Sequence, residues 1–483
     1  MVIVPPSIDL GAVGPELILT GAASLLLLVG VFFKEQSRAL NPWIALAGVI
    51  LAAGCASEPL FPHTTFQGMY AADLFTRFFK LLFLLGTGLT ILISIKYTAD
   101  EQIEHAEYYA LLLFATVGMM LMAAASDLVT VFLGIELLSL SLYILAGYTR
   151  VRLESNEASL KYFLLGGFAT GFLLYGMALI YGSTGHTNLA KIAYAVSHGG
   201  LNTSLLTMAA LMLLVGLGFK VAAAPFHQWT PDVYQGSPIP VTAFMSAGPK
   251  AAVLAVMIRV FEQAIAFMNV DWIVWITVLS ILTMTVGNIA ALVQSDAKRM
   301  LAFSSISHAG YAMVGMAAAN REGASAVLYY MLVYTFMNIG AFGILALVAR
   351  QNEKRTAMRD FSGLAYKNPA LAFIMTILVF SLAGIPPMAG FMAKFYIFMS
   401  AIKAGQNFLV LAAVLNSAIG IYYYLRFAIY MYMKEEQAPT TLPPLRASLG
   451  LILALVISLY GVIRLGILPA EYLDFAGKAF LSF

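Results

Sequence analysis

The sequence predicts an all-α membrane protein that crosses the bilayer about fourteen times, with two inverted five-helix repeats inside it. Three observations predict this fold. First, 61% of the 483 residues are hydrophobic and only 11% are charged, whereas ordinary soluble domains carry about 25% charged residues. Second, apolar segments of about 20 residues, the length of a membrane-crossing helix, follow one another along the chain. Third, two of these segments contain internal prolines, at Pro225 and at Pro386.

The expected crossings are separated by short segments, none of which is long enough to form a soluble domain. They span residues 13–33, 41–57, 74–95, 108–125, 128–148, 159–182, 204–234, 238–266, 271–294, 299–319, 324–349, 369–402, 406–432 and 448–468. The seventh and twelfth are expected to be discontinuous at Pro225 and at Pro386-Pro387, because proline removes a helical hydrogen bond. The N-terminus lacks the basic region of a cleavable signal peptide, so the first crossing is expected to be retained.

An internal repeat divides the predicted bundle. Ser126-Asp127 opens the fifth crossing and Ser295-Asp296 precedes the tenth, and the break at Pro225 has a counterpart at Pro386. A unit of five helices is odd, so the second copy must be inverted in the membrane, and paired broken helices indicate a transport site near the midplane. We expect a single membrane domain over 1–483, made of a three-helix segment (1–104), a first repeat (105–268), a second repeat (269–433) and a C-terminal helix (434–483).

Lysine and arginine in the loops predict the orientation of the chain. Five basic residues lie in one set of alternate loops and at the C-terminal end: Lys191, Arg321, Lys403, Arg464 and Lys478. Fourteen lie in the opposite set: Lys34, Arg38, Lys96, Arg150, Arg152, Lys298, Arg299, Arg350, Lys354, Arg355, Arg359, Lys367, Lys434 and Arg446. The richer set is expected to be cytoplasmic, which places both termini on the periplasmic side.

Four ionisable residues lie well inside the predicted crossings: Glu136, Lys220, Lys250 and Lys394. Each has a simple interpretation as a snorkelling side chain or as half of a structural ion pair, and Glu136 and Lys220 could neutralise each other. Lys250 and Lys394 have no obvious carboxylate partner. Because burial disfavours the charged form of an unpaired lysine, such a group can gain and lose a proton. A proton relay is therefore the favoured interpretation.

Three further residues could connect these groups. His227 lies seven residues beyond Lys220, and His308 lies in the tenth crossing among serines. Lys161 lies near the start of the sixth crossing. The competing interpretations are a hydrogen-bonded histidine at a helix end for His227 and a snorkelling side chain for Lys161.

Other residues predict no cofactor site. The single cysteine, Cys55, excludes an intrachain disulfide and an iron–sulfur cluster held by several cysteines of this chain. The six histidines show no metal-ligand spacing, and no phosphate-binding loop, nucleotide domain or nucleic-acid motif is visible. A set of three charges, Asp73, Arg77 and Lys80, shares one helical face and predicts a local salt-bridge stripe.

Four motifs carry a resemblance to a known family: GFKVAAAPFHQWTPDVYQGSP (218–238), SAGPKAAV (246–253), SDAKRMLAFSSISHAGYAMVG (295–315) and SLAGIPPMAGFMAKF (381–395). Over essentially its whole length the chain resembles the antiporter-like membrane subunits of respiratory complex I. Within them it is most similar to the subunit N group of NADH-quinone oxidoreductase, whose mitochondrial counterpart is NADH dehydrogenase subunit 2. Lys394 stands where subunit M has a glutamate, and the long lateral helix of subunit L is not seen.

The resemblance implies roles for the same residues. Glu136 would pair with Lys220, Lys250 would be the central proton carrier, and Lys394 would lie on the exit side. His227 and Lys161 match polar positions along the same axis.

The resemblance also implies a setting. The chain would couple NADH:quinone electron transfer elsewhere in complex I to proton pumping, with NAD, FMN, iron–sulfur clusters and quinone in the assembly and none in this chain. Its partners would be subunit M, the small K- and J-type subunits and lipid in the bacterial cytoplasmic membrane, with no nucleic acid. The alternatives are a subunit of a multisubunit sodium–proton antiporter or a membrane-bound hydrogenase, and a structural scaffold with inert charges.

Overall fold

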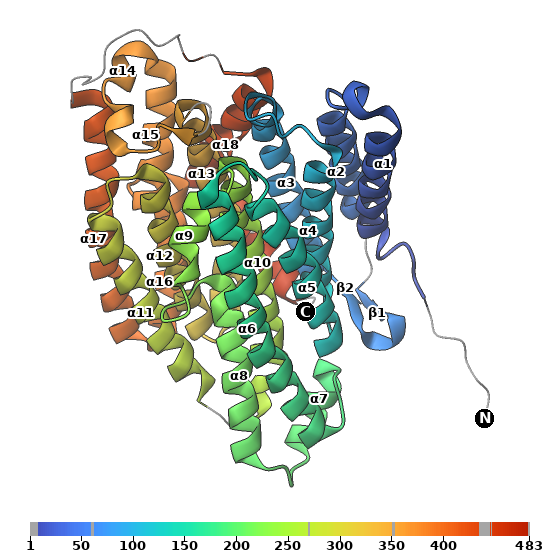
Figure 1. Ribbon diagram of the computed structural model, residues 1–483. Helices are drawn as coiled ribbons and strands as arrows, with labels where there is room; N and C mark the ends of the chain where they lie inside the picture. The colour runs from blue at the N-terminus through green and yellow to red at the C-terminus, as the bar shows by residue number, and fades with distance from the viewer. Residues whose placement is uncertain are drawn as a thin grey trace.

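The computed structural model describes residues 8–58, 62–268, 271–349, 353–433, 445 and 447–481. They form a bundle of roughly parallel and antiparallel helices (Figure 1). Its helices that take part in membrane crossings are α1 (Gly14–Ser37), α2 (Asn41–Ser57), α3 (Leu74–Asp100), α4 (Ala106–Ala124), α5 (Leu128–Ala146), α6 (Leu153–Thr184), α8 (Thr203–Val221), α9 (Trp229–Gly236), α10 (Ile239–Gln263), α11 (Trp272–Leu292), α12 (Ala297–Ala317), α13 (Arg321–Ala349), α15 (Pro369–Ala383), α16 (Ala389–Lys403), α17 (Asn407–Met433) and α18 (Leu449–Ile467).

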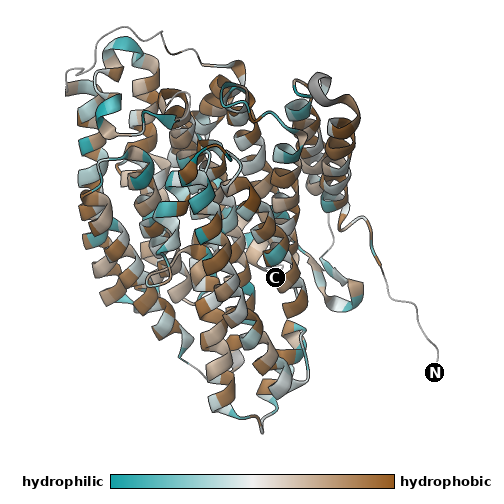
Figure 2. Cartoon of the chain, in the orientation of Figure 1, coloured by the Kyte–Doolittle hydropathy of each residue, from teal (hydrophilic) through white to brown (hydrophobic). Residues whose placement is uncertain are grey.

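The predicted all-α membrane fold is confirmed. Eleven helices of the described chain are long and apolar enough to cross a membrane, and α2 and α15 are shorter apolar helices. Figure 2 shows apolar residues along most helices, with hydrophilic residues gathered in loops and at helix ends. The helix α12 is the exception, because it carries Lys298, three serines and His308 and yet is buried along almost its whole length. A polar helix inside an apolar bundle marks the region where a hydrophilic path can form.

Both predicted discontinuities are present, and they share one geometry. The helix α8 ends at Ala222, which has a left-handed backbone (φ 64°), and α15 ends at Gly384, which has φ 86°. Pro225 follows the first of these residues by three positions, and Pro387 follows the second by three. The residue that corresponds to Pro225 is therefore Pro387, one position beyond the Pro386 expected from the sequence.

The inverted repeat is also visible in two matching turns. Asp127 caps the start of α5 and accepts a hydrogen bond from the Thr187 hydroxyl (2.7 Å), while Asp296 caps α12 and accepts one from the Thr356 hydroxyl. In each turn the threonine lies 60 residues after the aspartate. Each aspartate also forms an isolated antiparallel bridge with the residue directly after its threonine, Asn188 in the first turn and Ala357 in the second. The two repeats thus begin with the same turn.

Several short elements were not expected from the sequence, because they are too short or too polar to cross a membrane. The strands β1 (His63–Thr65) and β2 (Tyr70–Ala72) form an antiparallel hairpin. Figure 1 places α7 (Leu189–Ser197) at the end of the bundle where α6 and α8 meet. The remaining short helices are η1 (Phe66–Gly68), η2 (Ile265–Phe267), η4 (Met358–Phe361), α14 (Leu364–Lys367) and α19 (Ala470–Leu481).

The local salt-bridge stripe predicted on α3 is wrong. Asp73 pairs with Arg259 of α10 (2.8 Å), and Lys80 pairs with Glu16 of α1 (2.8 Å), with all four side chains buried. Arg77 donates hydrogen bonds to backbone carbonyls at the end of α2. The spacing of the three residues does place them on one face, but that face packs against other helices, which supply the partners.

Three of the basic residues used to predict the orientation, Arg350, Lys434 and Arg446, lie outside the described residues, as do both chain ends.

Candidate functional site

Lys220 lies in the last turn of α8, next to the first break. It is buried, and its Nζ donates a hydrogen bond to Ser139 Oγ of α5 (2.7 Å) and a longer one to the Tyr143 hydroxyl (3.4 Å). The Tyr143 ring centre is 5.7 Å from the same nitrogen. The ammonium group therefore contacts hydroxyl oxygens and an aromatic ring.

Glu136 and Lys220 form no direct ion pair in the described part of the chain. The Glu136 carboxylate instead accepts a hydrogen bond from the Thr170 hydroxyl of α6 (3.1 Å). Ser139, which holds Lys220, lies about one helical turn further along α5 than Glu136. The ion pair implied by the family resemblance is thus not formed in this structure, and Ser139 accepts the Lys220 hydrogen bond instead.

Lys250 lies at the centre of α10, a helix whose membrane-crossing part is completely buried. Its Nζ donates hydrogen bonds to the Ser305 carbonyl oxygen (2.6 Å) and to the Ser305 hydroxyl of α12. Pro249 precedes it and has no N–H, so the Met245 carbonyl loses its helical partner. The Tyr234 hydroxyl donates to that carbonyl instead (3.2 Å). This region of α10 therefore combines a buried charge with a freed backbone group.

Lys394 lies in α16, beyond the second break. Its Nζ donates to the Ala383 carbonyl (3.0 Å) and to the Ser417 hydroxyl (3.0 Å), and it lies 4.7 Å from the centre of the Tyr311 ring. Ala383 is the last residue of α15. A cation at the C-terminal end of a helix interacts favourably with its unpaired carbonyls and its dipole. The break thus supplies the oxygen that holds Lys394.

His308 lies in the same half of the bundle as Lys250 and Lys394, and it is buried. Its Nδ1 is 2.6 Å from the Tyr330 hydroxyl and its Nε2 is 3.2 Å from the Tyr424 hydroxyl. Tyr424 also shares a hydrogen bond with Ser304 of α12. These contacts connect α12, α13 and α17 by polar groups inside the bundle.

A second set of hydrogen bonds joins this region to Lys394. Tyr423 donates to the Asn288 side-chain oxygen (3.1 Å), and the Asn288 amide donates to the Tyr311 hydroxyl (3.1 Å), beside whose ring Lys394 lies. The sequence interpretation did not include these tyrosines, because tyrosine is common in packed cores and interfacial belts. One signal was available for Tyr424, which lies eight residues inside the end of its predicted crossing (406–432), deeper than an interfacial belt.

The other two predicted linkers, His227 and Lys161, differ in their surroundings. His227 lies in the break after α8, and its Nδ1 is buried with no hydrogen-bond partner in the described chain. Lys161 pairs with Glu157 (2.6 Å) and with Asp232 of α9 (2.9 Å), and its side chain is 40% exposed. Asp232, which also pairs with Arg299 (2.8 Å), was not singled out from the sequence. Lys161 is thus part of an ion-pair cluster at the edge of the bundle.

Comparison with known proteins gives the family. A model described as "NADH:quinone oxidoreductase/Mrp antiporter, TM" matches residues 125–420. The NADH-quinone oxidoreductase subunit N of Trichlorobacter lovleyi is 50% identical over 98% of this chain and 97% of its own length. That of Chloroflexus aggregans is 46% identical over 96% of each chain. The chain belongs to the subunit N family. The resemblance predicted from the four sequence motifs is confirmed.

Solved structures agree with this membership. A chain of respiratory complex I from Thermus thermophilus with bound aureothin superposes with a TM-score of 0.81 at 35% identity, covering 95% of this chain and 98% of the other. A chain of the archaeal membrane-bound sulfane sulfur reductase (TM-score 0.86, 24% identity, 98% and 97% covered) shares the fold. So does one of the Mrp complex from Dietzia (TM-score 0.82, 23% identity, 98% and 97% covered).

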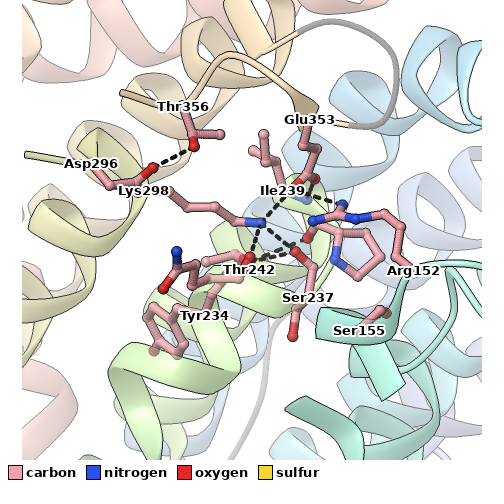
Figure 3. A network of polar contacts seen from close by, with 12 residues as sticks. Arg152, Ser155, Tyr234, Ser237, Ile239, Thr242, Asp296, Lys298, Glu353 and Thr356 are labelled. Atoms are coloured by element: carbon pink, nitrogen blue, oxygen red, sulfur yellow. Dashed lines mark hydrogen bonds and ion pairs between the residues drawn. The ribbon is translucent and has the colours of Figure 1, made fainter. Parts of the chain in front are cut away.

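This subunit N family member also has a buried ion cluster where the end of α9 and the start of α10 meet the start of α12 (Figure 3). Glu353 pairs with Lys298 (2.7 Å) and Arg152 (3.0 Å), and it accepts a hydrogen bond from the Ile239 N–H at the start of α10 (2.8 Å). Lys298 also donates to the Ser237 and Gln235 carbonyls at the end of α9. Burial alone would raise the pKa of the Glu353 carboxyl, but Lys298 and Arg152 hold that pKa below its usual range.

The buried lysines therefore fall into two classes. Lys80 and Lys298 pair with carboxylates, whereas Lys220, Lys250 and Lys394 are held by hydroxyl and carbonyl oxygens. In the described part of the chain no three His, Cys, Asp or Glu side chains gather into a group that could hold a metal ion.

Proposed function

We propose that this chain moves protons across the membrane as a subunit of a proton-translocating NADH:quinone oxidoreductase. The observation that carries the proposal is that three buried lysines have no carboxylate partner in the described structure. Lys220, Lys250 and Lys394 are buried within membrane crossings, and their hydrogen bonds go only to hydroxyl and carbonyl oxygens in the described structure.

These partners suit a group that changes its protonation state. A charged side chain at the centre of a membrane helix costs about 2.5–3.5 kcal/mol on insertion scales, and such residues mark ion and proton paths. A carboxylate partner would favour the charged form in every state of the cycle, and Lys298 has such a partner in Glu353. A serine or tyrosine hydroxyl instead accepts from an ammonium group and donates to a neutral amine. The same contact can therefore persist before and after proton transfer.

The proposed path takes these residues in order along the bundle, and hydrogen bonds link Lys250 to Ser305 and Ser304 through Tyr424 to His308. A proton passes from Lys220 through His227 to Lys250, and from there through Ser305, Ser304, Tyr424 and His308 towards Lys394 and the outer face. The unpartnered Nδ1 of His227 is available for the first step, and the hydroxyl contacts of His308 support the second. Lys161 lies at the proposed cytoplasmic edge, where it can feed the path.

Glu136 provides the point of control. When its carboxylate approaches Lys220 it stabilises the ammonium group, and when it withdraws to Thr170 the ammonium group is left with hydroxyl partners alone. The structure has the second arrangement. Moving one charge against 100 mV costs about 2.3 kcal/mol, so the movement needs an external drive. Quinone reduction elsewhere in the assembly supplies it, with NAD, FMN, iron–sulfur clusters and quinone held by other subunits.

The proposed setting is the bacterial cytoplasmic membrane, with both termini on the periplasmic side. The partners are subunit M, the small K- and J-type subunits and lipid. The basic loop residues support this orientation, because the described members Arg38, Lys96 and Lys367 all lie at the same end of the helices.

The test uses inverted membrane vesicles that contain the complete assembly. Lys220→Ala and Lys250→Ala are expected to lower the number of protons taken up per NADH oxidised, while Lys403→Ala, which removes an exposed ion pair with Glu322, leaves that number unchanged. The amount of assembled complex in each membrane is measured in parallel, so that a folding defect is recognised. Wild-type proton uptake by both Lys220 and Lys250 variants would overturn the proposal.

A subunit of a sodium–proton antiporter is the second candidate, because the Dietzia Mrp chain shares the fold. Assays on the purified assembly that contains this chain distinguish the two functions. An assembly that contains this chain and reduces quinone with NADH supports the first, whereas sodium-dependent proton exchange without NADH oxidation supports the second.

A further inference from the structure

Two arginines occupy equivalent positions in the two repeats. Arg259 lies on α10, the last helix of the first repeat, and Arg426 lies on α17, the last helix of the second. Arg259 donates a hydrogen bond to the Ala123 carbonyl near the end of α4 (2.7 Å), and Arg426 donates one to the Leu292 carbonyl at the end of α11 (2.7 Å). Each carbonyl lies four residues before the aspartate that caps the next helix of its repeat. The last helix of each repeat is thus joined to the first by the same contact.

The ionic partners of the two arginines differ. Asp73, which caps the start of α3, accepts hydrogen bonds from Arg259 Nη2 through both carboxylate oxygens (2.9 and 2.8 Å). Arg426 donates only to the Leu292 carbonyl and to the Gln294 carbonyl (2.6 Å) within the described chain. Its Nε is buried without a hydrogen-bond partner, and no carboxylate of the described residues pairs with its guanidinium group. The second repeat therefore lacks the carboxylate that α3 brings to the first.

The packing around the two repeats differs in the same way. The helix α4 packs against α1, α2 and α3 as well as against α5 and α10 of its own repeat, and α3 also packs against α10. In contrast, α11 packs mainly against α12 and α17 of its own repeat. Accordingly, 78% of the apolar segment of α4 and 100% of that of α10 are buried, against 33% for α11 and 39% for α17. Figure 1 places α11 and α17 on the side of the bundle opposite α1 and α2.

We propose that a helix of an adjoining membrane chain packs along α11 and α17 and pairs an aspartate or glutamate side chain with Arg426. This helix takes the place beside the second repeat that α3 takes beside the first, with its carboxylate level with the end of α11. The contact joins this chain to a neighbour, so it does not depend on whether the chain moves protons.

The chemistry of Arg426 suits this partner. An arginine has five N–H donors and keeps its charge in proteins, and Arg426 uses two of the five within the described chain. The planar guanidinium group matches the geometry of a carboxylate. The two helices also carry exposed apolar side chains, among them Leu282 (44%) and Ile289 (53%) on α11 and Leu415 (58%) on α17. An apolar helix with one carboxylate near its end is complementary to this face.

Two other anions compete for Arg426. One is the phosphate of a phospholipid at the membrane surface, and the other is the carboxylate of Glu435 or Glu436 of this chain, which lie outside the described residues. A carboxylate of another chain is favoured because Arg259, the equivalent residue, receives its carboxylate from a helix outside its own repeat. Experiment separates the three sources.

The first experiment identifies the carboxylate. Arg426→Lys keeps the positive charge and supplies a primary amine, which a membrane-permeant carbodiimide joins to a carboxylate in contact with it. The reaction forms an amide, and the carbodiimide becomes a urea by taking up the water that is lost. In membranes that contain the complete assembly, we expect mass spectrometry to find position 426 joined to a peptide of another membrane chain. The matched control is Arg259→Lys, which should be joined to Asp73 of this chain.

Two results of this experiment would overturn the proposal. In the first, position 426 is joined to Glu435 or Glu436, because the carboxylate then belongs to this chain. In the second, position 426 forms no link, although Arg259→Lys, treated in the same way, is joined to Asp73.

The second experiment measures the contact between the chains. This chain is purified by an affinity tag from membranes solubilised in mild detergent, and the neighbouring chains and phospholipids that remain bound are quantified. We expect Arg426→Gln to retain several-fold less of the adjoining chain than the wild type, because it leaves the partner carboxylate unpaired, whereas Arg426→Lys retains it. Arg359→Gln, which changes an exposed arginine in the segment after α13, is the control and should retain all chains. If Arg426→Gln keeps every neighbouring chain and loses only phospholipid, the anion is a lipid headgroup and the proposal is wrong.

Discussion

Glu353 and Lys298 form an ion pair of 2.7 Å in which each side chain is only 1% exposed. The pair joins the segment after α13 to the start of α12, and through Ser237 and Ile239 it holds the turn between α9 and α10. It therefore fixes the short second half of the first broken helix at the end opposite the break. We therefore assign this cluster a structural role, in contrast to the lysines of the proposed proton path.

Removing one member of this cluster should destabilise the chain. Glu353→Gln leaves Lys298 and Arg152 buried without their carboxylate, and breaking a buried pair in this way costs about 3–5 kcal/mol. We expect the purified complex with this variant to unfold at a lower temperature than the wild type. Glu322→Gln, which breaks the exposed pair with Lys403, is the control, since such pairs contribute less than about 1 kcal/mol. Equal unfolding curves for the two variants would contradict the structural role.

The same carboxylate predicts a dependence of stability on pH. Lys298 and Arg152 hold the pKa of Glu353 below its usual range in the folded chain. Its stabilising contribution is therefore complete above the unfolded pKa of about 4.3 and is lost as the pH falls through the lower, folded value. Thermal stability of the wild type should drop over that acid range, and Glu353→Gln should show a smaller drop. Parallel pH profiles for the two proteins would refute this assignment.

The second break should be sensitive to a single methyl group. A Cβ atom at Gly390 would lie 1.8 Å from the Ser381 carbonyl oxygen, so Gly390→Ala must push α16 away from α15. Because Lys394 reaches from α16 to the last carbonyl of α15, we expect its hydrogen bond to be lost and proton uptake to fall. Gly171→Ala, in the interior of α6 with open space around the new Cβ, should be neutral or stabilising by about 0.5–1 kcal/mol. Normal pumping by Gly390→Ala would show that the Lys394 contact is dispensable.

The tyrosine beside His308 should matter for transfer in the second repeat. Tyr424→Phe removes the hydroxyl shared with His308 Nε2 and Ser304, and the buried groups left unpaired cost about 1–3 kcal/mol. We expect the assembled complex to retain NADH oxidation in the presence of an uncoupler but to take up fewer protons per NADH. Tyr422→Phe, an exposed neighbour on α17, is the comparison and should behave as the wild type. A Tyr424→Phe complex with undiminished proton uptake would exclude the hydroxyl from the path.

The membrane crossings were predictable because the bilayer sets the length of each helix and demands apolar side chains along it. The breaks near Pro225 and Pro387 were visible for a similar reason, since proline and charge interrupt an otherwise uniform pattern. The lysines of the proposed path were also visible, because a charge inside an apolar segment is recognisable at any position. These features depend on local composition alone.

The partners of those residues could not be predicted in the same way. Ser139, Ser305 and Ser417 hold the three lysines, but a serine in an apolar helix gives no signal of the direction in which it points. Asp73 and Lys80 have the spacing of a local stripe, and only the packing of α3 against α10 and α1 shows that their partners lie elsewhere. Contacts between helices are set by tertiary packing, which a single sequence does not display.

The matching turns at Asp127 and Asp296 have a consequence for the direction of transport. Glu136 lies nine residues after Asp127, and Ser305 lies nine residues after Asp296. In the same way, Ser139 and His308 lie twelve residues after Asp127 and Asp296, respectively. A backbone built from two inverted copies is nearly the same when viewed from either side of the membrane, so it cannot by itself distinguish inward from outward flow. The distinction must come from side chains that differ between the copies. A carboxylate opposed to a serine and a serine opposed to a histidine are two such differences, and in the proposed path they would favour one direction of proton flow over the other.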